Sequence, residues 1–348
     1  MRTLSVLFCF SLAFQAAASH SLFDTNVFAH KVTNVTALAE GADDSRIVNL
    51  VGQILQRSHY ERKPLDNAVS SQFLDQYLST LDPQHLYFLK TDMDEFEAYR
   101  YRLDNRILED GDANPAPIIF NRFRRRLDQQ YDFAMELLRT EKFQFTGEER
   151  YLFNRKEQPR PADMAEAKKL WRDRLRHEYL QEKLVIAKPA DIAAIVLEKL
   201  KAGEAGQLHE ALKEKLGKER IAEIEALVKN AQEKDKATPE ATADKVRQQI
   251  DAGNAREIVK VLSRRYTRVL RSLNEYDNGD VLQLYLTALA HVYDPHSDYM
   301  GKNALENFSI GMKLSLFGIG ALLRSEDGYC KIVSLTPNGP AEKSKKLK

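Results

Sequence analysis

The stretch PAPIIFNRFRRRLDQQYDFAMELL, residues 115–138, decides the fold class of this chain. Its apolar residues recur every three or four positions, which is the spacing of one face of an α-helix. Pro115 and Pro117 suit the first turn of such a helix, where the missing proline N–H leaves no bond unmade. The expected inward face is Phe120, Phe123, Leu127, Tyr131, Ala134 and Leu138. The stretch therefore predicts a long amphipathic helix.

The same spacing recurs on both sides of this stretch. Asp44-Ser45 and Thr91 are expected to cap two earlier helices, and Asp82-Pro83 ends another because proline cannot continue the hydrogen-bond ladder. The apolar faces are Ile47, Leu50, Val51, Ile54 and Leu55; Phe73, Leu74, Tyr77, Leu78 and Leu81; Phe96, Tyr99, Leu103 and Ile107; Leu170, Trp171, Leu175, Tyr179, Leu180 and Leu184; Ile258, Leu262, Tyr266, Leu270 and Leu273; and Leu284, Leu286 and Leu289. The predicted fold class is mainly α, a helical N-terminal platform.

The charge balance argues against nucleic acid as a partner. The 348 residues hold 52 lysines and arginines against 51 aspartates and glutamates, so no net field gathers a polyanion. Arg122, Arg124, Arg125 and Arg126 cluster on the predicted helix, and a solvated face with paired acids is the favoured interpretation of that cluster. Scarce glycine, 15 residues, and 30% charged residues suit long helices arranged in more than one unit.

The first residues have the pattern of a signal peptide. A basic start at Arg2 precedes the apolar run Leu4–Phe14 and a small-residue stretch, with cleavage expected after Ala18. The apolar run is too short to span a bilayer, and no later stretch reaches the length of a membrane helix. A buried N-terminal helix is the alternative. Export would remove Cys9 and leave Cys330 alone, so no intramolecular disulfide is expected.

Composition divides the chain further. Between Lys188 and Gly253 it shifts to Ala, Glu, Lys and Leu, which indicates an inserted helical arm. Breaks are expected at Gly203, Gly206, Gly217 and Pro239, and the seam Leu208, Leu212, Leu216, Ile221, Ile224 and Leu227 should pack locally rather than against a partner. The predicted units are a signal peptide 1–18, a helical domain 19–187, a charged helical insertion 188–253, the helical domain continued 254–307, and a β-containing domain 308–348.

From Ser309 onward the pattern is that of strands. Met312, Leu314 and Leu316 alternate with polar residues, and Cys330–Leu335 forms a second apolar run. Between them, Gly318-Ile319-Gly320-Ala321 permits a sharp turn whose backbone amides could receive a peptide's terminal carboxylate, while the peptide adds as a strand to the sheet edge. An ordinary tight turn is the alternative for this Gly-x-Gly element.

Four motifs together resemble one family. Ser315–Ala321, with Gly339-Pro340-Ala341-Glu342-Lys343-Ser344 after it, looks like the first half of a PDZ domain of the carboxy-terminal processing (tail-specific) proteases. Asp294-Pro295-His296-Ser297-Asp298-Tyr299 is similar to that family's Asp-Pro-His-Ser/Thr-x-Tyr signature. Leu170–Leu175 and Asp280–Leu284 resemble the helical N-terminal region of its long periplasmic branch. The likeness covers most of the chain after residue 18 and is weakest over 188–253.

The resemblance implies a periplasmic serine endopeptidase whose PDZ domain grips the apolar C-terminal tails of protein substrates. A serine nucleophile and a lysine base, neutral through burial, would cleave the peptide bond. In the family both lie downstream of the PDZ domain, beyond Lys348, so no catalytic residue, metal or cofactor is expected in this chain. The implied peptide-binding residues are Phe317, Gly318, Ile319, Gly320, Ala321 and Leu322. An adaptor protein as a further partner is left open.

The resemblance also implies that the later strands and second helix of the PDZ domain fall outside this sequence. Ile319, Leu322, Ile332 and Val333 would then lack part of their packing, so we expect loose order after about Asn307. Two hypotheses follow. The chain is the inactive N-terminal part of a tail-specific protease, or it is a stand-alone, non-enzymatic helical interaction module of the periplasm.

Other constellations are weaker. Asp294, His296 and Ser297 have the residue types of a hydrolytic triad, but such near neighbours cannot line up as nucleophile, base and orienter, so a helix-ending turn is favoured. His291 with Asp294 and His296 could touch a metal, yet no His-Glu-x-x-His pattern or cysteine pair accompanies them. Cys330, at the start of a strand, is expected to be a small core residue.

Overall fold

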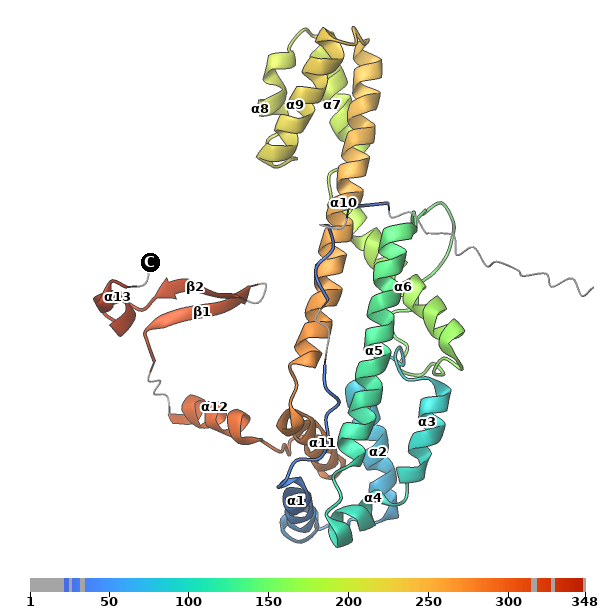
Figure 1. The fold of residues 1–348 in the computed structure, drawn as a ribbon, viewed down its shortest axis with the longest axis vertical. Coiled ribbons are helices and arrows are strands. Elements are labelled where there is room, and N and C mark those ends of the chain that lie inside the picture. Colours follow the sequence, from blue (N-terminus) through green and yellow to red (C-terminus); the bar gives the residue numbers. More distant parts are fainter. Residues whose placement is uncertain (1–21, 25–26, 32–34, 314–317, 327–328, 347–348) are drawn as a thin grey trace, which may run out of the picture.

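The computed structural model describes residues 22–24, 27–31, 35–313, 318–326 and 329–346 (Figure 1). The predicted signal peptide, 1–18, lies outside the described residues. The prediction of a mainly α fold is confirmed, because the described strands form only one two-stranded sheet. Among the described residues, no helix is both long and apolar enough to cross a membrane.

Long helices form the body of the molecule. In Figure 1 helix α5 runs beside α10 and α6, while the shorter α1–α4 and α11 gather at one end. The helices of the body are α1 (Asp44–Ser58), α2 (Asn67–Leu81), α3 (Lys90–Phe96), α4 (Leu103–Asn105), α5 (Pro115–Thr140), α6 (Met164–Val185), α10 (Pro239–Asn274) and α11 (Asn278–Tyr293). The long helix predicted to begin at Pro115 and to reach at least Leu138 is therefore present as α5.

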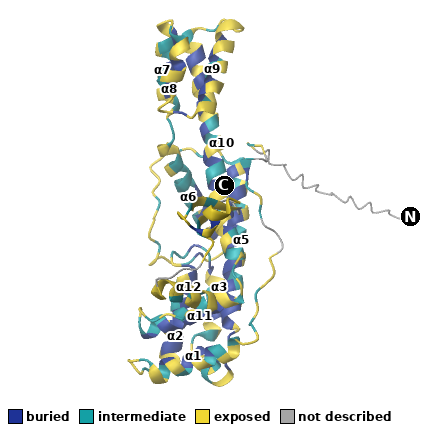
Figure 2. Ribbon diagram, turned by 90° about the vertical axis from the view of Figure 1, so that its left-hand side faces the viewer, coloured by how far each residue is buried: buried dark blue, intermediate teal, exposed yellow. Residues whose placement is uncertain are grey.

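Two apolar cores hold the body together. The first lies among α1, α2, α5 and α11, with Phe73, Tyr77 and Tyr285 at its centre. The second lies where α5, α6 and α10 meet, around Leu127 and Leu262. Burying large side chains of this kind stabilises the fold by about 1.5–3 kcal/mol each. Buried residues accordingly run along the helices of the body and reappear in the arm (Figure 2).

The arm forms a third helical cluster. It consists of α7 (Pro189–Lys201), a 3-10 turn (Ala205–Gln207), α8 (Leu208–Leu212), α9 (Lys218–Glu233) and the first half of α10. Its own core contains Leu208, Leu212, Ile221 and Ile224 against Val246, so the predicted seam packs locally. In Figure 1 the arm stands at the opposite end of α10 from α11.

Helix α10 corrects one sequence expectation. It runs for 36 residues from Pro239 to Asn274 without interruption at Gly253. The predicted boundary between 253 and 254 therefore falls inside a helix shared by arm and body. A helical glycine costs only about 1 kcal/mol relative to alanine, and packing on both halves of α10 outweighs that cost.

Two helical patterns were misjudged near the first core. Helix α1 buries Val48, Gly52 and Leu55, while Leu50 and Ile54 are 56% and 49% exposed, so the buried face is rotated from the predicted one. A Cβ at Gly52 would lie 2.5 Å from Ile107 Cγ2, which shows how closely α1 approaches that residue.

The single helix expected from Thr91 to Ile107 is instead broken into α3, a 3-10 turn (Glu97–Tyr99), α4 and a π-helical turn (Arg106–Asp110).

Three of the four clustered arginines on α5 are not on a solvated face, and only Arg125 among them is exposed. Arg122 and Arg126 both contact the fully buried Asp92 of α3, at 2.5 and 2.7 Å, and Arg122 also pairs with Glu95. Arg124 is buried and donates to the carbonyl oxygen of Thr36. The expectation of paired acids is confirmed, but these arginines join elements of the fold.

The C-terminal part differs from the predicted strand pattern. Residues 309–313 belong to helix α12 (Lys302–Lys313), so the strand expected from Ser309 is wrong there, and residues 314–317 lie outside the described part of the chain. Strands β1 (Ala321–Glu326) and β2 (Tyr329–Leu335) then pair, and α13 (Pro340–Ser344) follows. In Figure 1 this hairpin and α13 stand apart from the bundle.

Candidate functional site

The candidate peptide-binding loop lies at the start of the hairpin. Gly318, Ile319 and Gly320 form the turn that leads into β1, and Ala321 and Leu322 are the first residues of that strand. Phe317, the remaining residue predicted for this site, lies outside the described residues. The loop, as far as it is described, is therefore followed directly by an edge strand.

Strand β1 pairs with β2 in antiparallel register. Ala321 lies opposite Leu335 and Glu326 opposite Tyr329, with an irregularity between Leu322 and Leu323. The sheet has two strands in the described part of the chain, so one edge of β1 carries backbone groups that pair with no other described strand. Such an edge is a template for the addition of an extended peptide.

The loop is fastened to the segment before α13. Thr336 N donates to the Gly320 carbonyl oxygen at 2.8 Å, and Ala341 N donates to the Ile319 carbonyl oxygen at 2.8 Å. Gly320 has φ of +73°, and a Cβ there would lie 3.0 Å from Pro340 Cδ and 3.1 Å from Gly339 Cα. Only glycine suits this position, because both the backbone conformation and the close approach exclude a side chain.

The carbonyl oxygens of Ile319 and Gly320 accept hydrogen bonds, but the amides of the loop donate none to described residues. The N–H groups of Gly318, Ile319 and Gly320 donate no hydrogen bond to any residue that the structure describes. Successive free backbone amides are a common anion-binding arrangement. Chemically, the loop can therefore offer hydrogen bonds to a carboxylate at the end of the β1 edge.

Apolar side chains beside the loop are open to solvent. Ile319 is 53% exposed and Leu322 is 59% exposed; Val333 on β2 is exposed as well, and Ile332 is half-buried. Cys330, expected in a core, is also exposed, because no second layer of described structure covers that face of the hairpin. These side chains could contact the apolar residues of a bound peptide.

The Asp294–Tyr299 motif forms a tight turn after α11. Ser297 N donates to the carbonyl oxygen of Asp294, and Ser297 Oγ donates to Asp294 Oδ2 at 3.2 Å. His59 Nε2 from the end of α1 lies 3.3 Å from Ser297 Oγ, so the turn joins α11 to α1. The order here is acid, serine, histidine, and a hydrolytic triad needs the histidine between the other two. The favoured interpretation, a helix-ending turn, is confirmed.

The charged side chains of the turn interact with residues close to them in sequence. Burial opposes ionisation of Asp294, but hydrogen bonds from the side chains of His296 and Ser297 and from the His296 amide prevail and lower the pKa of Asp294. His291 Nε2 lies 2.9 Å from Asp298 Oδ1, which gives the second histidine a partner of its own. Asp294 is thus ionised, and its hydrogen bonds hold the turn that ends α11.

Comparison with known proteins assigns the helical part of the chain to a family. Residues 51–303 match the family described as the tail specific protease N-terminal domain, so the match runs from the second half of α1 through α11. The chain belongs to that family. The tail-specific protease of Haemophilus influenzae is 29% identical over 294 residues, which cover 84% of this chain and 32% of that protein. The chain thus spans about a third of the length of this tail-specific protease relative.

Proposed function

We propose that this chain is the N-terminal part of an exported, periplasmic tail-specific serine endopeptidase, in which it serves as scaffold and recognises substrate tails. The helical body carries the loop 317–322, and the loop receives the C-terminal carboxylate of a protein substrate. No residue of this chain is assigned the role of nucleophile or general base. Membership of the tail-specific protease N-terminal domain family supports the protease assignment.

One observation carries the recognition role. The amides of Gly318, Ile319 and Gly320 are unused among the described residues and stand at the end of the free β1 edge. A peptide pairing with β1 would bring its terminal carboxylate to these amides, where a charged acceptor makes hydrogen bonds of about 1.5–3 kcal/mol. Its apolar side chains would contact the exposed Ile319 and Leu322.

The test compares two fluorescein-labelled peptides that both end in Val-Ala-Val. One has a free C-terminal carboxylate and the other a C-terminal amide. We expect the free acid to bind at least about tenfold more tightly in fluorescence anisotropy, because each 1.4 kcal/mol changes the dissociation constant tenfold. Gly320→Ala should weaken binding of the acid. Gly206→Ala, in the arm, is the matched control, because a Cβ there meets no described atom within 4 Å.

Equal binding of acid and amide would overturn the recognition role. Mass spectrometry of the incubated peptide should show no cleavage by the purified chain. A cleaved product would mean that this chain contains a nucleophile of its own, which the proposal denies. The alternative function, a stand-alone interaction module, predicts that the helical body binds a partner protein while neither peptide binds. An exported mature form that begins at Ser19, measured by N-terminal sequencing, would support periplasmic localisation.

A further inference from the structure

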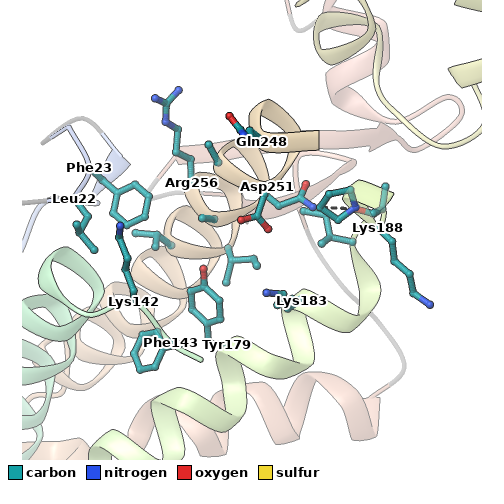
Figure 3. Close-up of a pocket in the computed structure, with 18 of the residues that line it drawn as sticks. Leu22, Phe23, Lys142, Phe143, Tyr179, Lys183, Lys188, Gln248, Asp251 and Arg256 are labelled. Carbon is teal, nitrogen blue, oxygen red and sulfur yellow. Dashed lines mark hydrogen bonds between the residues drawn. The ribbon is translucent and has the colours of Figure 1, made fainter. Parts of the chain in front are cut away.

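A cleft of about 550 Å³ lies at the base of the arm, far from the peptide-binding loop in sequence. Figure 3 shows side chains from several segments around it: the residues at 22–23, the segment after α5, helix α6, the segment between α6 and α7, and helix α10. Leu22 is fixed there by its amide, which donates to the Arg139 carbonyl oxygen at 2.7 Å. The volume is within the usual range for a small-ligand or peptide site.

The cleft has an apolar wall. Ile258 and Val259 of α10 are buried, and aromatic rings face them from the other segments. The apolar lining residues are Leu22, Phe23, Phe143, Tyr179, Ile186, Ile258 and Val259. Such a wall removes apolar ligand surface from water, which favours binding by about 25 cal/mol for each Å² buried.

The polar side of the cleft is mostly cationic. Its basic lining residues form no ion pair with any described residue; they are Lys142, Lys183, Lys188 and Arg256. Glu141 also lines it, but its carboxylate is taken by Arg172 at 2.5 Å. Figure 3 shows Lys183 and Asp251 pointing toward the space above the Tyr179 ring. With four basic residues and one unpaired acid, Asp251, in its lining, the cleft favours an anionic group.

A buried acceptor in the cleft also lacks a donor. Asn254 is 5% exposed, and its Nδ2 donates to the Ala187 carbonyl oxygen at 2.9 Å. Its Oδ1 is buried and has no hydrogen-bond partner among the described residues. An unsatisfied buried acceptor costs about 1–3 kcal/mol, so a ligand N–H at this point would be stabilised.

We propose that this cleft binds a short peptide segment with an acidic residue between apolar residues. The acidic side chain lies between Lys142 and Lys183, and a backbone N–H donates to Asn254 Oδ1. The apolar side chains pack on the partly exposed Phe143, Tyr179 and Ile186. A peptide supplies the N–H, the carboxylate and the apolar groups within one small span, whereas a free inorganic anion supplies only the charge. The site is independent of the loop at 318–322 and of a terminal carboxylate.

Isothermal titration of the full chain with N-acetyl-Leu-Glu-Leu-amide tests the proposal. Both ends of this probe are blocked, so the loop at 318–322 has no carboxylate to receive. We expect saturable binding, and about tenfold weaker binding of N-acetyl-Leu-Gln-Leu-amide, since a charge-assisted contact of about 1.4 kcal/mol is lost. Lys142→Glu and Lys183→Glu should each weaken binding of the glutamate probe about tenfold. Lys229→Glu, an exposed and unpaired lysine on α9, is the matched control.

Nuclear magnetic resonance locates the bound probe. The side-chain amide signals of Asn254 should shift during the titration, while those of the exposed Asn230 on α9 stay in place. Absence of saturable binding, equal binding of the two probes, or binding unchanged by both lysine reversals would each overturn the proposal. Gly320→Ala should leave this binding intact, so failure here is distinguishable from failure of the proposed tail recognition.

Discussion

Asp82 Oδ2 lies 2.5 Å from Nη1 of Arg160, a residue 78 positions later in the chain. The carboxylate is fully buried and also accepts hydrogen bonds from the amides of Leu86, Tyr87 and Phe88. It therefore fastens the turn between α2 and α3 to the segment that precedes α6. Burial lowers the pKa of Arg160, while the Asp82 charge opposes that shift.

Replacing Arg160 should be costly for stability. Arg160→Ala leaves a buried carboxylate without its counter-charge, so the free energy of unfolding should fall by about 3 kcal/mol in urea denaturation. Arg150→Ala is the control, because Arg150 is exposed and forms no ion pair with described residues. Equal midpoints for the two variants would contradict the buried pair.

Asp92 should make stability depend on acid pH. Burial opposes its ionisation, but hydrogen bonds from Arg126, from the Leu89 amide and from Arg122 prevail and hold the pKa of Asp92 below its ordinary value. A lowered folded-state pKa means that the stabilisation is complete above the unfolded pKa of about 3.9 and is lost as pH falls through the folded pKa.

The check is the difference in unfolding free energy between the natural chain and Asp92→Asn. We expect about 3 kcal/mol at neutral pH and a shrinking difference below about pH 4. Asp244→Asn, at an exposed aspartate of α10 without an ion pair, should show no such trend. A difference that stays constant down to pH 2 would argue against an ionised Asp92 in the fold.

Gly253 tests whether arm and body share one helix. In a continuous α10, Gly253→Ala should raise the unfolding free energy by about 0.5–1 kcal/mol through helix propensity. The added Cβ would meet only the flexible end of Arg220, at 3.0 Å from Nη2. Gly253→Pro should lower it by about 3 kcal/mol. A neutral Gly253→Pro variant, measured by thermal unfolding, would instead support a break at the predicted boundary.

The hairpin should exchange its amides faster than the bundle. Leu322, Leu323 and Val333 are exposed, whereas the equivalent large residues of α2 and α11 are buried, so less burial opposes local opening. Hydrogen exchange by mass spectrometry should show early deuteration of 321–335 and late deuteration of 69–81. Cys330 should react with iodoacetamide in the native chain at nearly its rate in urea. Strong protection of the hairpin would refute this expectation.

Much of the helical body could be predicted because local patterns and tertiary packing agree there. The run from Phe120 to Leu138 shows a clean period, and proline marks the helix start, so the start and the inward face of α5 were predicted. Other parts could not be predicted. Gly253 marked the end of a shift in composition, and no local signal showed that one helix runs through it. The buried face of α1 differs from the predicted one because α1 packs closely against Ile107 at Gly52. Met312 sits in α12 although its neighbours alternate as a strand would.

Of the two candidate sites, one could be predicted from the sequence and the other could not. The turn at Gly318–Gly320 was visible in the sequence because glycine spacing reports a local backbone requirement, and Gly320 does have positive φ. The cleft around Asn254 was not visible, since Tyr179, Lys183 and Asp251 come from helices that only folding brings together.

By itself, then, the sequence determined the class of the fold, the ends of its clearest helices and the family resemblance. These depend on periodicity, capping and short motifs, all of which act over a few residues. Tertiary structure alone decided which face of α1 is buried, that α10 is continuous, and that the arginines of α5 neutralise Asp92. Those outcomes depend on contacts between residues distant in the chain, whose burial and charge pairing outweigh local preference.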